Sequence, residues 1–99
     1  MYKREEILEF LRANKDLLLS KYSLTKIGIF GSYAREEQTE KSDIDFIFEF
    51  EKDAKGLYSK KFALHEYLKS ELKKEVDLCR EGAIKPVFKS YILKDAIYV

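Results

Sequence analysis

The strongest constraint on the fold is the segment 43–51, which reads DIDFIFEFE. Successive side chains of a β-strand point to opposite faces of a sheet, so the alternation predicts a strand over residues 43–50. One face would be apolar and would lie in the core. The opposite face would begin with the carboxylates of Asp43 and Asp45 and would continue with Ile47 and Glu49.

A Gly-Ser pair precedes this strand. Residues 26–30 (KIGIF) form an apolar run typical of a strand, and residues 32–37 can form the first turns of a short helix. A helix that begins at Gly31 and Ser32 would point backbone N–H groups and a hydroxyl at a phosphate, and glycine would allow close approach. Ten residues separate Ser32 from Asp43.

The two aspartates suit a hard divalent cation. Proteins usually bind Mg²⁺ through one or two carboxylates together with phosphate oxygens of a substrate. An isolated Asp-x-Asp is more often the polar side of a half-exposed strand. The Gly-Ser pair and a third acidic strand favour instead a site that holds a nucleoside triphosphate and its metal ions.

Helices alternate with strands along the rest of the chain. Apolar residues at helical spacing predict amphipathic helices over residues 3–20 and 57–73, and Pro86 marks the start of a closing helix that ends near residue 95. Residues 75–79 (EVDLC) predict a short strand. We expect one domain over residues 1–99, of the α/β (α+β) class, with a small mixed sheet of three to four strands covered by helices.

The helix expected over residues 57–73 would connect two strands. A right-handed crossover through this helix would make the strands at 43–50 and 75–79 parallel neighbours. Asp77 would then lie beside Asp43 and Asp45 on the same face of the sheet. Glu75, two residues before Asp77, is the competing choice for the third carboxylate.

These features resemble a known family. Gly31-Ser32, the ten-residue gap and Asp43-Ile44-Asp45 are similar to the signature of the polymerase β-like nucleotidyltransferase superfamily. The fuller pattern GSYAR...T..SDIDF resembles the minimal nucleotidyltransferase branch. The likeness continues through EVDL at residues 75–78 and KPVFKSYILKDAIYV at residues 85–99.

The resemblance implies a metal-dependent transfer of AMP from ATP to a hydroxyl group, with pyrophosphate leaving. Two Mg²⁺ ions would be held by Asp43, Asp45 and Asp77, which would be the catalytic residues, and Gly31 with Ser32 would hold the β and γ phosphates. Minimal nucleotidyltransferases are commonly the antitoxin partner of a toxin that is a HEPN-type ribonuclease. The resemblance therefore also implies that AMP is attached to a tyrosine of that toxin.

Two positions depart from the family pattern. Glu36 stands where the family often has glycine, and Glu40 stands where it often has proline. Neither position is a metal ligand in that pattern. We expect these departures to affect the shape of the loop and the choice of acceptor more than nucleotide binding.

The sequence leaves two other functions open. The chain could be a catalytically idle antitoxin that binds its partner, or a transferase that acts on a small molecule or a nucleic acid end. Only 22 residues follow Asp77. We therefore expect the acceptor to bring its own docking surface or to bind at an oligomer interface, as a folded partner protein would.

Four further residues receive weaker expectations. Arg35 is a less favoured candidate for contact with a phosphate, and Tyr33 for stacking near the nucleotide. His65 has no second metal-type ligand near it in sequence, so we expect a solvated or partly packed side chain. The single cysteine, Cys79, is expected to be a small buried hydrophobic residue.

Charge and hydropathy limit the possible partners and the cellular location of the protein. The net charge is +1, with 19 Lys and Arg against 18 Asp and Glu, so composition gives no support for nonspecific binding of nucleic acid. No apolar run approaches the roughly 20 residues needed to span a bilayer, and the first residues lack a signal-peptide pattern. We expect a cytoplasmic protein with no membrane partner.

Overall fold

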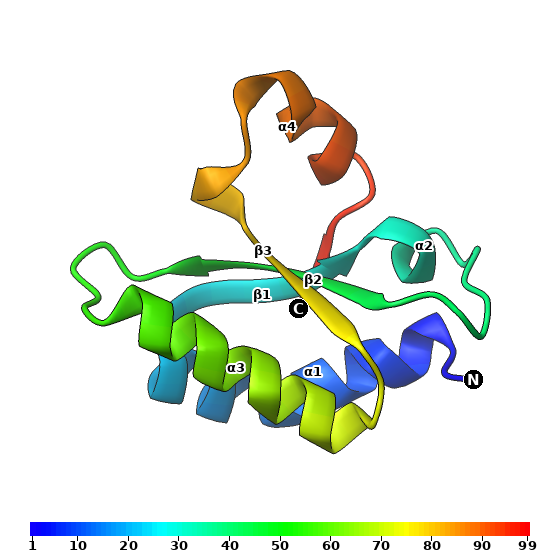
Figure 1. Ribbon diagram of the computed structural model, residues 1–99, viewed down its shortest axis with the longest axis horizontal. Helices are drawn as coiled ribbons and strands as arrows, with labels where there is room; N and C mark the ends of the chain where they lie inside the picture. The colour runs from blue at the N-terminus through cyan, green and yellow to red at the C-terminus, as the bar shows by residue number, and fades with distance from the viewer.

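Four strands form one mixed sheet in the order β3-β2-β1-β4, and helices lie on both sides of it (Figure 1). The structure is a computed structural model that describes residues 1–99. Four helices and a four-stranded mixed sheet confirm the predicted fold class. In chain order the elements are α1 (Arg4–Tyr22), β1 (Leu24–Phe30), α2 (Gly31–Ala34), β2 (Ile44–Phe50), α3 (Leu57–Leu72), β3 (Val76–Arg80), the 3-10 helix η1 (Glu81–Ala83), α4 (Pro86–Leu93) and β4 (Ile97–Tyr98).

The core lies under one face of the sheet and confirms the alternation in β2. Ile44, Phe46 and Phe48 are fully buried, and Phe50 is nearly so. α1 and α3 cover this face, and their apolar side chains join those of the strands in a cluster of 18 buried residues (Figure 1). Ile47 points to the opposite face and is also fully buried. The face that carries Asp45 is therefore not uniformly polar.

β2 and β3 run parallel, as the helix between them predicts. Their register pairs Ile44 with Val76 and Asp45 with Asp77. Paired residues on neighbouring strands point to the same face of a sheet. Asp45 and Asp77 therefore lie side by side, on the face opposite the layer formed by α1 and α3.

β1 pairs antiparallel with both β2 and β4. The sequence pattern does not predict β4, because a strand of two residues is too short to show a period. Gly28 allows the pairing, since a Cβ atom at this position would collide with the backbone of Ile97 and Tyr98. The close approach at Gly28 thus returns the C-terminal residues to the edge of the sheet.

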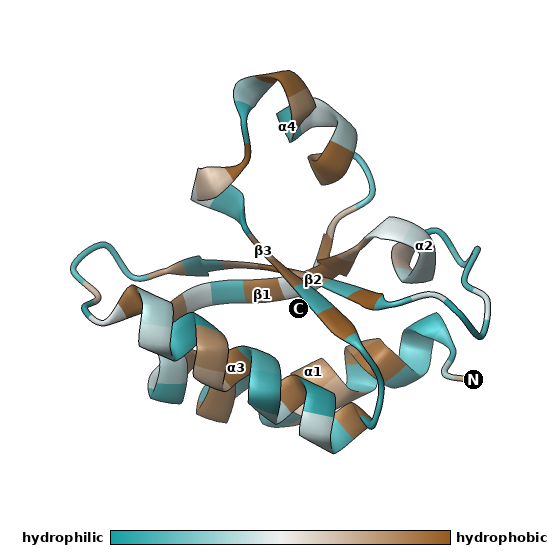
Figure 2. Ribbon diagram, in the orientation of Figure 1, coloured by the Kyte–Doolittle hydropathy of each residue, from teal (hydrophilic) through white to brown (hydrophobic).

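α4 stands away from the sheet. It begins at Pro86, as predicted, and none of its residues is buried. Val87, Phe88 and Tyr91 are 76%, 53% and 71% exposed. Figure 2 shows hydrophobic segments on α4 well apart from those of the strands. The closing helix expected from the sequence is present, but it contributes little to the core.

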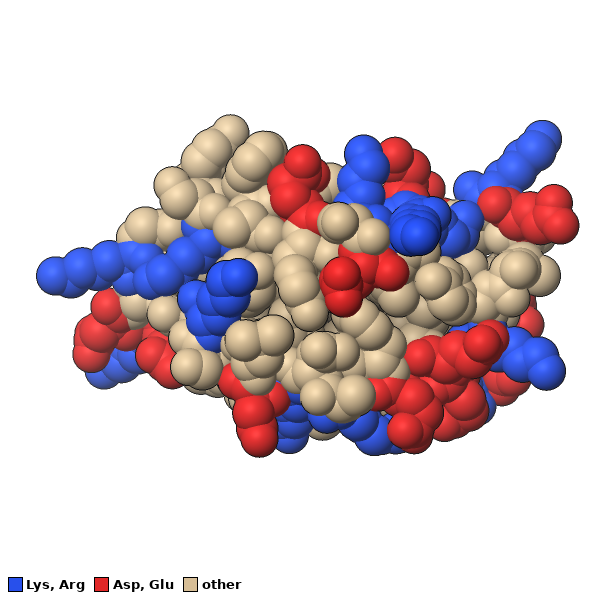
Figure 3. Space-filling view, turned by 90° about the horizontal axis from the view of Figure 1, so that it is seen from below, with Lys and Arg blue, Asp and Glu red and all other residues tan.

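The surface carries no large field of one sign on the side formed by α1 and α3. On this side Lys and Arg are interspersed with Asp and Glu (Figure 3). This mixture agrees with the net charge of +1, and it differs from the concentrated basic surface that nucleic acid binding requires. None of the helices has the length and apolar composition needed to cross a membrane.

α2 ends earlier than predicted because Glu36 adopts a left-handed backbone conformation, with φ of 59°. This conformation explains why glycine suits the position. The Glu36 carboxylate pairs with Nη2 of Arg4 at 2.9 Å. The departure from the family pattern therefore adds a surface ion pair and retains a strained backbone.

We expect Glu36→Gly to be more stable than Glu36→Ala by about 1 kcal/mol. Both variants lose the pair with Arg4, but only glycine adopts a positive φ without steric cost. Urea unfolding of the two variants measures the difference. Equal free energies of unfolding would show that residue 36 carries no backbone strain.

Candidate active site

The turn at Gly31 joins β1 to α2 and lies against Asp45. Gly31 has φ of 71°, a left-handed conformation that glycine adopts readily. A Cβ atom on Gly31 would collide with Oδ2 of Asp45 and would stand 3.1 Å from its carboxyl carbon. The register of the sheet also places Phe30, the last residue of β1, opposite Asp45. The Gly-Ser turn and the second aspartate are therefore packed together.

Three carboxylates act on one another at this end of the sheet. Asp43 and Asp77 are exposed, whereas Asp45 between them is partly buried. Burial, together with the negative charges of Asp77 and Asp43, raises the pKa of Asp45 from 3.8 to about 6. Arg35 acts in the opposite direction. The register of β2 and β3 places Asp77 beside Asp45, and Asp43 directly precedes β2, so the three predicted carboxylates lie at one end of the sheet.

Other acids on the same side of the sheet are neutralised within the chain. Glu49 accepts a hydrogen bond from Nε of Arg80 at 2.7 Å. Glu81 pairs with Nζ of Lys26 at 2.9 Å and also accepts a hydrogen bond from the Tyr98 hydroxyl. These contacts fasten η1 and β4 to the sheet. They also leave the group of three aspartates as the unneutralised part of this face.

The three aspartates form no ion pair with any Lys, Arg or His side chain. Oxygen donors with uncompensated negative charge fit a hard divalent cation such as Mg²⁺. No three His, Cys, Asp or Glu side chains converge closely enough to enclose one ion in this structure. The fit to a metal ion therefore rests on the carboxylate oxygens as ligand atoms and on the combined negative charge of the three aspartates.

Asp77 and Glu75 differ in their surroundings. Asp77 lies within β3 and pairs in register with Asp45. Glu75 precedes the strand, is 64% exposed in its side chain, and pairs with Nζ of Lys69 at 3.1 Å. Because the Glu75 carboxylate is already paired with the Lys69 ammonium group, the geometry favours Asp77 as the third acid.

Comparisons with known proteins agree with this arrangement. A model of the nucleotidyltransferase domain matches residues 6–99. The chain belongs to this family. A relative of this nucleotidyltransferase from Methanocaldococcus jannaschii, named as a candidate protein adenylyltransferase, is 50% identical over 95 residues, which cover 95% of each chain.

Solved structures confirm the fold and the resemblance to minimal nucleotidyltransferases. A candidate minimal nucleotidyltransferase superposes on this nucleotidyltransferase with a TM-score of 0.71 at 31% identity, covering 91% of this chain and 93% of that one. A complex of a tri-AMPylated Shewanella oneidensis HEPN toxin with its MNT antitoxin gives a TM-score of 0.62 at 21% identity. That superposition covers 91% of this chain and 69% of the other, and it shows a shared fold.

The structure corrects one weaker expectation about this nucleotidyltransferase and refines another. Tyr33 is fully buried in the core, so the idea that it stacks near a nucleotide is wrong; a helix of four residues turns position 33 inward. Arg35 pairs with Glu37 at 2.8 Å and with Asp95 at 3.2 Å. Its guanidinium therefore links α2 to the segment after α4, and contact with a phosphate would compete with these pairs.

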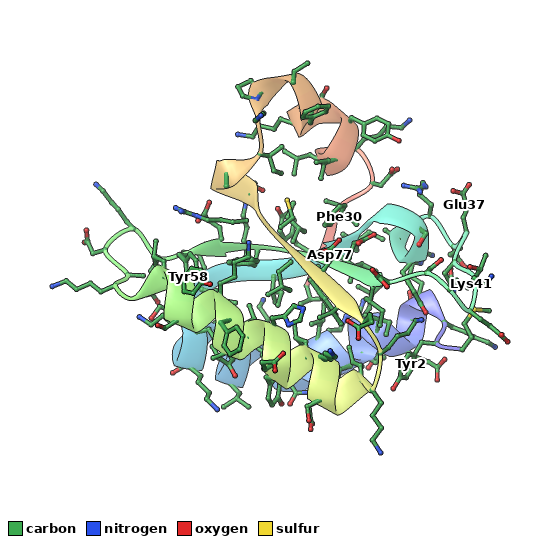
Figure 4. All side chains as sticks on the ribbon, in the orientation of Figure 1. Tyr2, Phe30, Glu37, Lys41, Tyr58 and Asp77 are labelled. Carbon is green, nitrogen blue, oxygen red and sulfur yellow. The ribbon has the colours of Figure 1, made fainter.

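Sequence reasoning missed a small hollow beside Asp77. The hollow lies where α3 meets β3, and Figure 4 shows Tyr58 on α3 and Asp77 on β3. His65 belongs to it as a partly packed residue, as expected, with Nε2 3.1 Å from the Val76 carbonyl oxygen. The available signal was the helical spacing of Tyr58, Phe62 and His65 on a stripe other than the buried leucines of α3.

Cys79 follows Asp77 by two residues on the same face. It is partly buried, which comes close to the expected small hydrophobic residue. Burial raises the pKa of its thiol, and the charge of Lys61 acts in the opposite direction. The thiol is therefore kept in its neutral form at physiological pH, and we assign it no chemical role.

Asp45→Asn should stabilise the metal-free protein at pH 7.5 by about 1–2 kcal/mol. The pKa of Asp45 is about 6 in the folded chain and near 3.8 when exposed, so the ionised carboxylate destabilises the fold. The estimate lies below the full linkage value because solvent screens a partly exposed group. The penalty sets in between about pH 4 and pH 6, so the gain should vanish below pH 4.

Urea unfolding with EDTA at pH 7.5 and at pH 3.5 measures this gain. Asp53→Asn, in the exposed turn before α3, is the matched control and should change little at either pH. A gain for Asp45→Asn that is equal at both values of pH would contradict the proposed charge coupling.

Proposed function

We propose that this nucleotidyltransferase moves AMP from ATP to a tyrosine hydroxyl of a HEPN-type toxin and thereby acts as its antitoxin. The observation that carries the proposal is the register of β2 and β3, which sets Asp45 beside Asp77 and next to the Gly31 turn. In this proposal, the residues that bind the donor phosphates and the residue that meets the acceptor hydroxyl would both lie on one face of the sheet.

The residues of the chain would divide the work of the reaction. Gly31 and Ser32 would hold the β and γ phosphates, because the left-handed turn at Gly31 lets a phosphate approach the backbone closely. Asp43, Asp45 and Asp77 would hold two Mg²⁺ ions, which supply charge neutralisation at the attacking and leaving oxygens of such transfers. Asp77 would orient the acceptor hydroxyl and accept its proton.

Placement and charge stabilisation would supply most of the rate enhancement. Fixing two reactants in line removes entropy that a solution reaction has to lose in its transition state. Asp45 is well suited to this purpose because the Gly31 turn restricts its carboxylate on one side. With ATP as the donor, we place the reaction in the cytoplasm.

The choice of partner is supported by the relatives. The M. jannaschii relative is named as a candidate protein adenylyltransferase, and the S. oneidensis structure contains an AMPylated HEPN toxin together with an MNT antitoxin. The shared fold and the complete set of three aspartates support transfer to a protein. A binding-only antitoxin would have no need to keep these three acids unneutralised on one face.

Incubation with ATP, Mg²⁺ and the product of the adjacent reading frame tests the function. Intact-mass analysis should show AMP additions on that product, and peptide mapping should place them on a tyrosine. Omission of ATP or addition of EDTA should abolish the additions. The absence of any addition under complete conditions would overturn the proposed activity.

A further inference from the structure

A pocket of about 290 Å³ opens between the N-terminal half of α3 and the outer edge of the sheet. β3 is the edge strand here, so the pocket meets Asp77 at the free edge of the sheet, away from β2. The Asp77 carboxylate lies on the face opposite α3, and Lys61 reaches around this edge, since its charge acts on Cys79 on the Asp77 face. The volume lies near the lower limit of roughly 300 Å³ for pockets that hold drug-sized ligands. It suits one ring better than a whole nucleotide. The lining residues are Tyr58, Lys61, Phe62, His65, Asp77 and Leu78.

A larger hollow of about 480 Å³ lies beside the N-terminal residues and the loop before β2. It is lined by Met1, Tyr2, Glu6, Glu40, Lys73 and Lys74, and it contains none of the three aspartates. Size alone would favour this hollow as a binding site. We base the choice on Asp77 instead, because a reacting group has to reach the carboxylates.

The order of the strands decides what the smaller pocket can receive. The Gly31 turn lies at the end of β1, on one side of β2, and Asp77 lies on β3, on the other side. In a phosphoryl-type transfer the attacking and leaving oxygens are roughly in line, on opposite sides of the phosphorus. If the proposed function holds and pyrophosphate leaves toward Gly31, the attacking hydroxyl enters from the β3 side.

The lining of the pocket matches an aromatic hydroxyl. Tyr58 and Phe62 are 89% and 62% exposed, so two rings stand beside the site without a packing partner that covers them. Lys61 takes part in no ion pair. Its ammonium group can stabilise negative charge that develops on a phenolic oxygen. Leu78 adds apolar surface between the rings and the sheet.

We propose that this pocket between α3 and β3 binds the ring of the acceptor tyrosine, with Tyr58 and Phe62 as specificity residues and Lys61 beside the phenolic oxygen. The proposal rests on the proposed function and names how its substrate is recognised. Aromatic pairs at such contacts stabilise binding beyond simple burial. Two rings would therefore select tyrosine over serine or threonine.

The reaction at this pocket balances with ATP as the only co-reactant. The phenolic oxygen forms a bond to the α phosphorus, and the bond from that phosphorus to the oxygen that bridges to the β phosphorus breaks. Pyrophosphate leaves with the bridging oxygen. The phenolic proton passes to the Asp77 carboxylate and then to water, and the product is an AMP-tyrosine phosphodiester.

A titration with N-acetyl-tyrosinamide, followed by ¹H–¹⁵N NMR with Mg²⁺ and AMP-PNP present, tests the pocket. Saturable shifts should centre on residues 58–65 and 77–78. Tyr58→Ala/Phe62→Ala should raise the dissociation constant about tenfold or more. It should also raise KM for the protein acceptor while KM for ATP stays the same. Tyr91→Ala, at another exposed tyrosine on α4, is the control and should change neither.

Three results would overturn the assignment. The first is that no shift saturates, or that the saturable shifts lie only in other elements. The second is that Tyr58→Ala/Phe62→Ala binds the tyrosinamide as tightly as the wild type does. The third is that the shifts at the pocket depend on AMP-PNP and not on the tyrosinamide. The last would identify the pocket as the adenine site. A wild type that binds the tyrosinamide here but transfers no AMP to any acceptor would overturn the proposed function and not the pocket.

Discussion

Asp77→Asn should lower AMP transfer by about 10²–10⁴-fold and should leave the affinity for Mg²⁺-ATP within about threefold. Asp77 lies on β3, across β2 from the Gly31 turn, so we expect its carboxylate to serve the acceptor side more than the triphosphate. Loss of a general base costs about this factor in rate. An interaction made chiefly in the transition state affects kcat more than binding of the ground state.

Glu75→Gln provides the matched control for this experiment. It removes one negative charge two residues away, but Glu75 pairs with Lys69 outside the group of aspartates. Single-turnover transfer and calorimetric titration of ATP should both remain close to the wild type. An inactive Glu75→Gln together with an active Asp77→Asn would assign the third carboxylate to Glu75 and contradict the geometry.

Gly31→Ala should abolish tight binding of Mg²⁺-ATP and reduce transfer at least about a hundredfold. Alanine at φ of 71° costs about 1–2 kcal/mol in backbone strain. In addition, its Cβ atom would collide with Oδ2 of Asp45. The carboxylate then has to move, and a displacement of about 1 Å near the reacting groups is enough to lower a rate a hundredfold.

The control variant Gly56→Ala distinguishes the effect of backbone strain from the effect of displacing the Asp45 carboxylate. Gly56 has φ of 65°, close to that of Gly31, but a Cβ atom there would meet nothing within 4 Å. Both variants should therefore lose free energy of unfolding through backbone strain, and only Gly31→Ala should lose activity. Melting curves and transfer rates measured on the same samples distinguish the two effects. Equal losses of activity would mean that backbone strain alone explains Gly31→Ala.

The sequence alone predicts those parts of the structure that follow a regular side-chain periodicity or a known motif spacing. The alternation in β2 fixes which side chains enter the core, and the helix between β2 and β3 predicts the parallel register that sets Asp45 beside Asp77. Local periodicity and chain connectivity carry this information. They do not separate Asp77 from Glu75, because both residues flank the inward-facing Val76 and share a face of the strand; the resemblance to the family pattern favours Asp77.

Other features depend on contacts between distant segments, which no local pattern records. Ile47 is buried on the polar side of β2, and β4 forms only because Gly28 admits the C-terminal backbone. Tyr33 enters the core because α2 is a single turn. The pocket beside Asp77 requires the docking of α3 against β3, so Tyr58 and Phe62 could not be assigned to the site from their spacing alone.

The most direct test of transfer at the three aspartates compares the wild type with Asp43→Asn/Asp45→Asn on the proposed HEPN-type partner, with the product of the adjacent reading frame as the candidate. Both proteins are added at matched concentrations with ATP and Mg²⁺, and the intact mass and ribonuclease activity of the partner are measured. We predict AMP additions and lost ribonuclease activity with the wild type, and neither with the double variant. Equal neutralisation by both proteins, with no change in mass, would contradict transfer and establish neutralisation by binding.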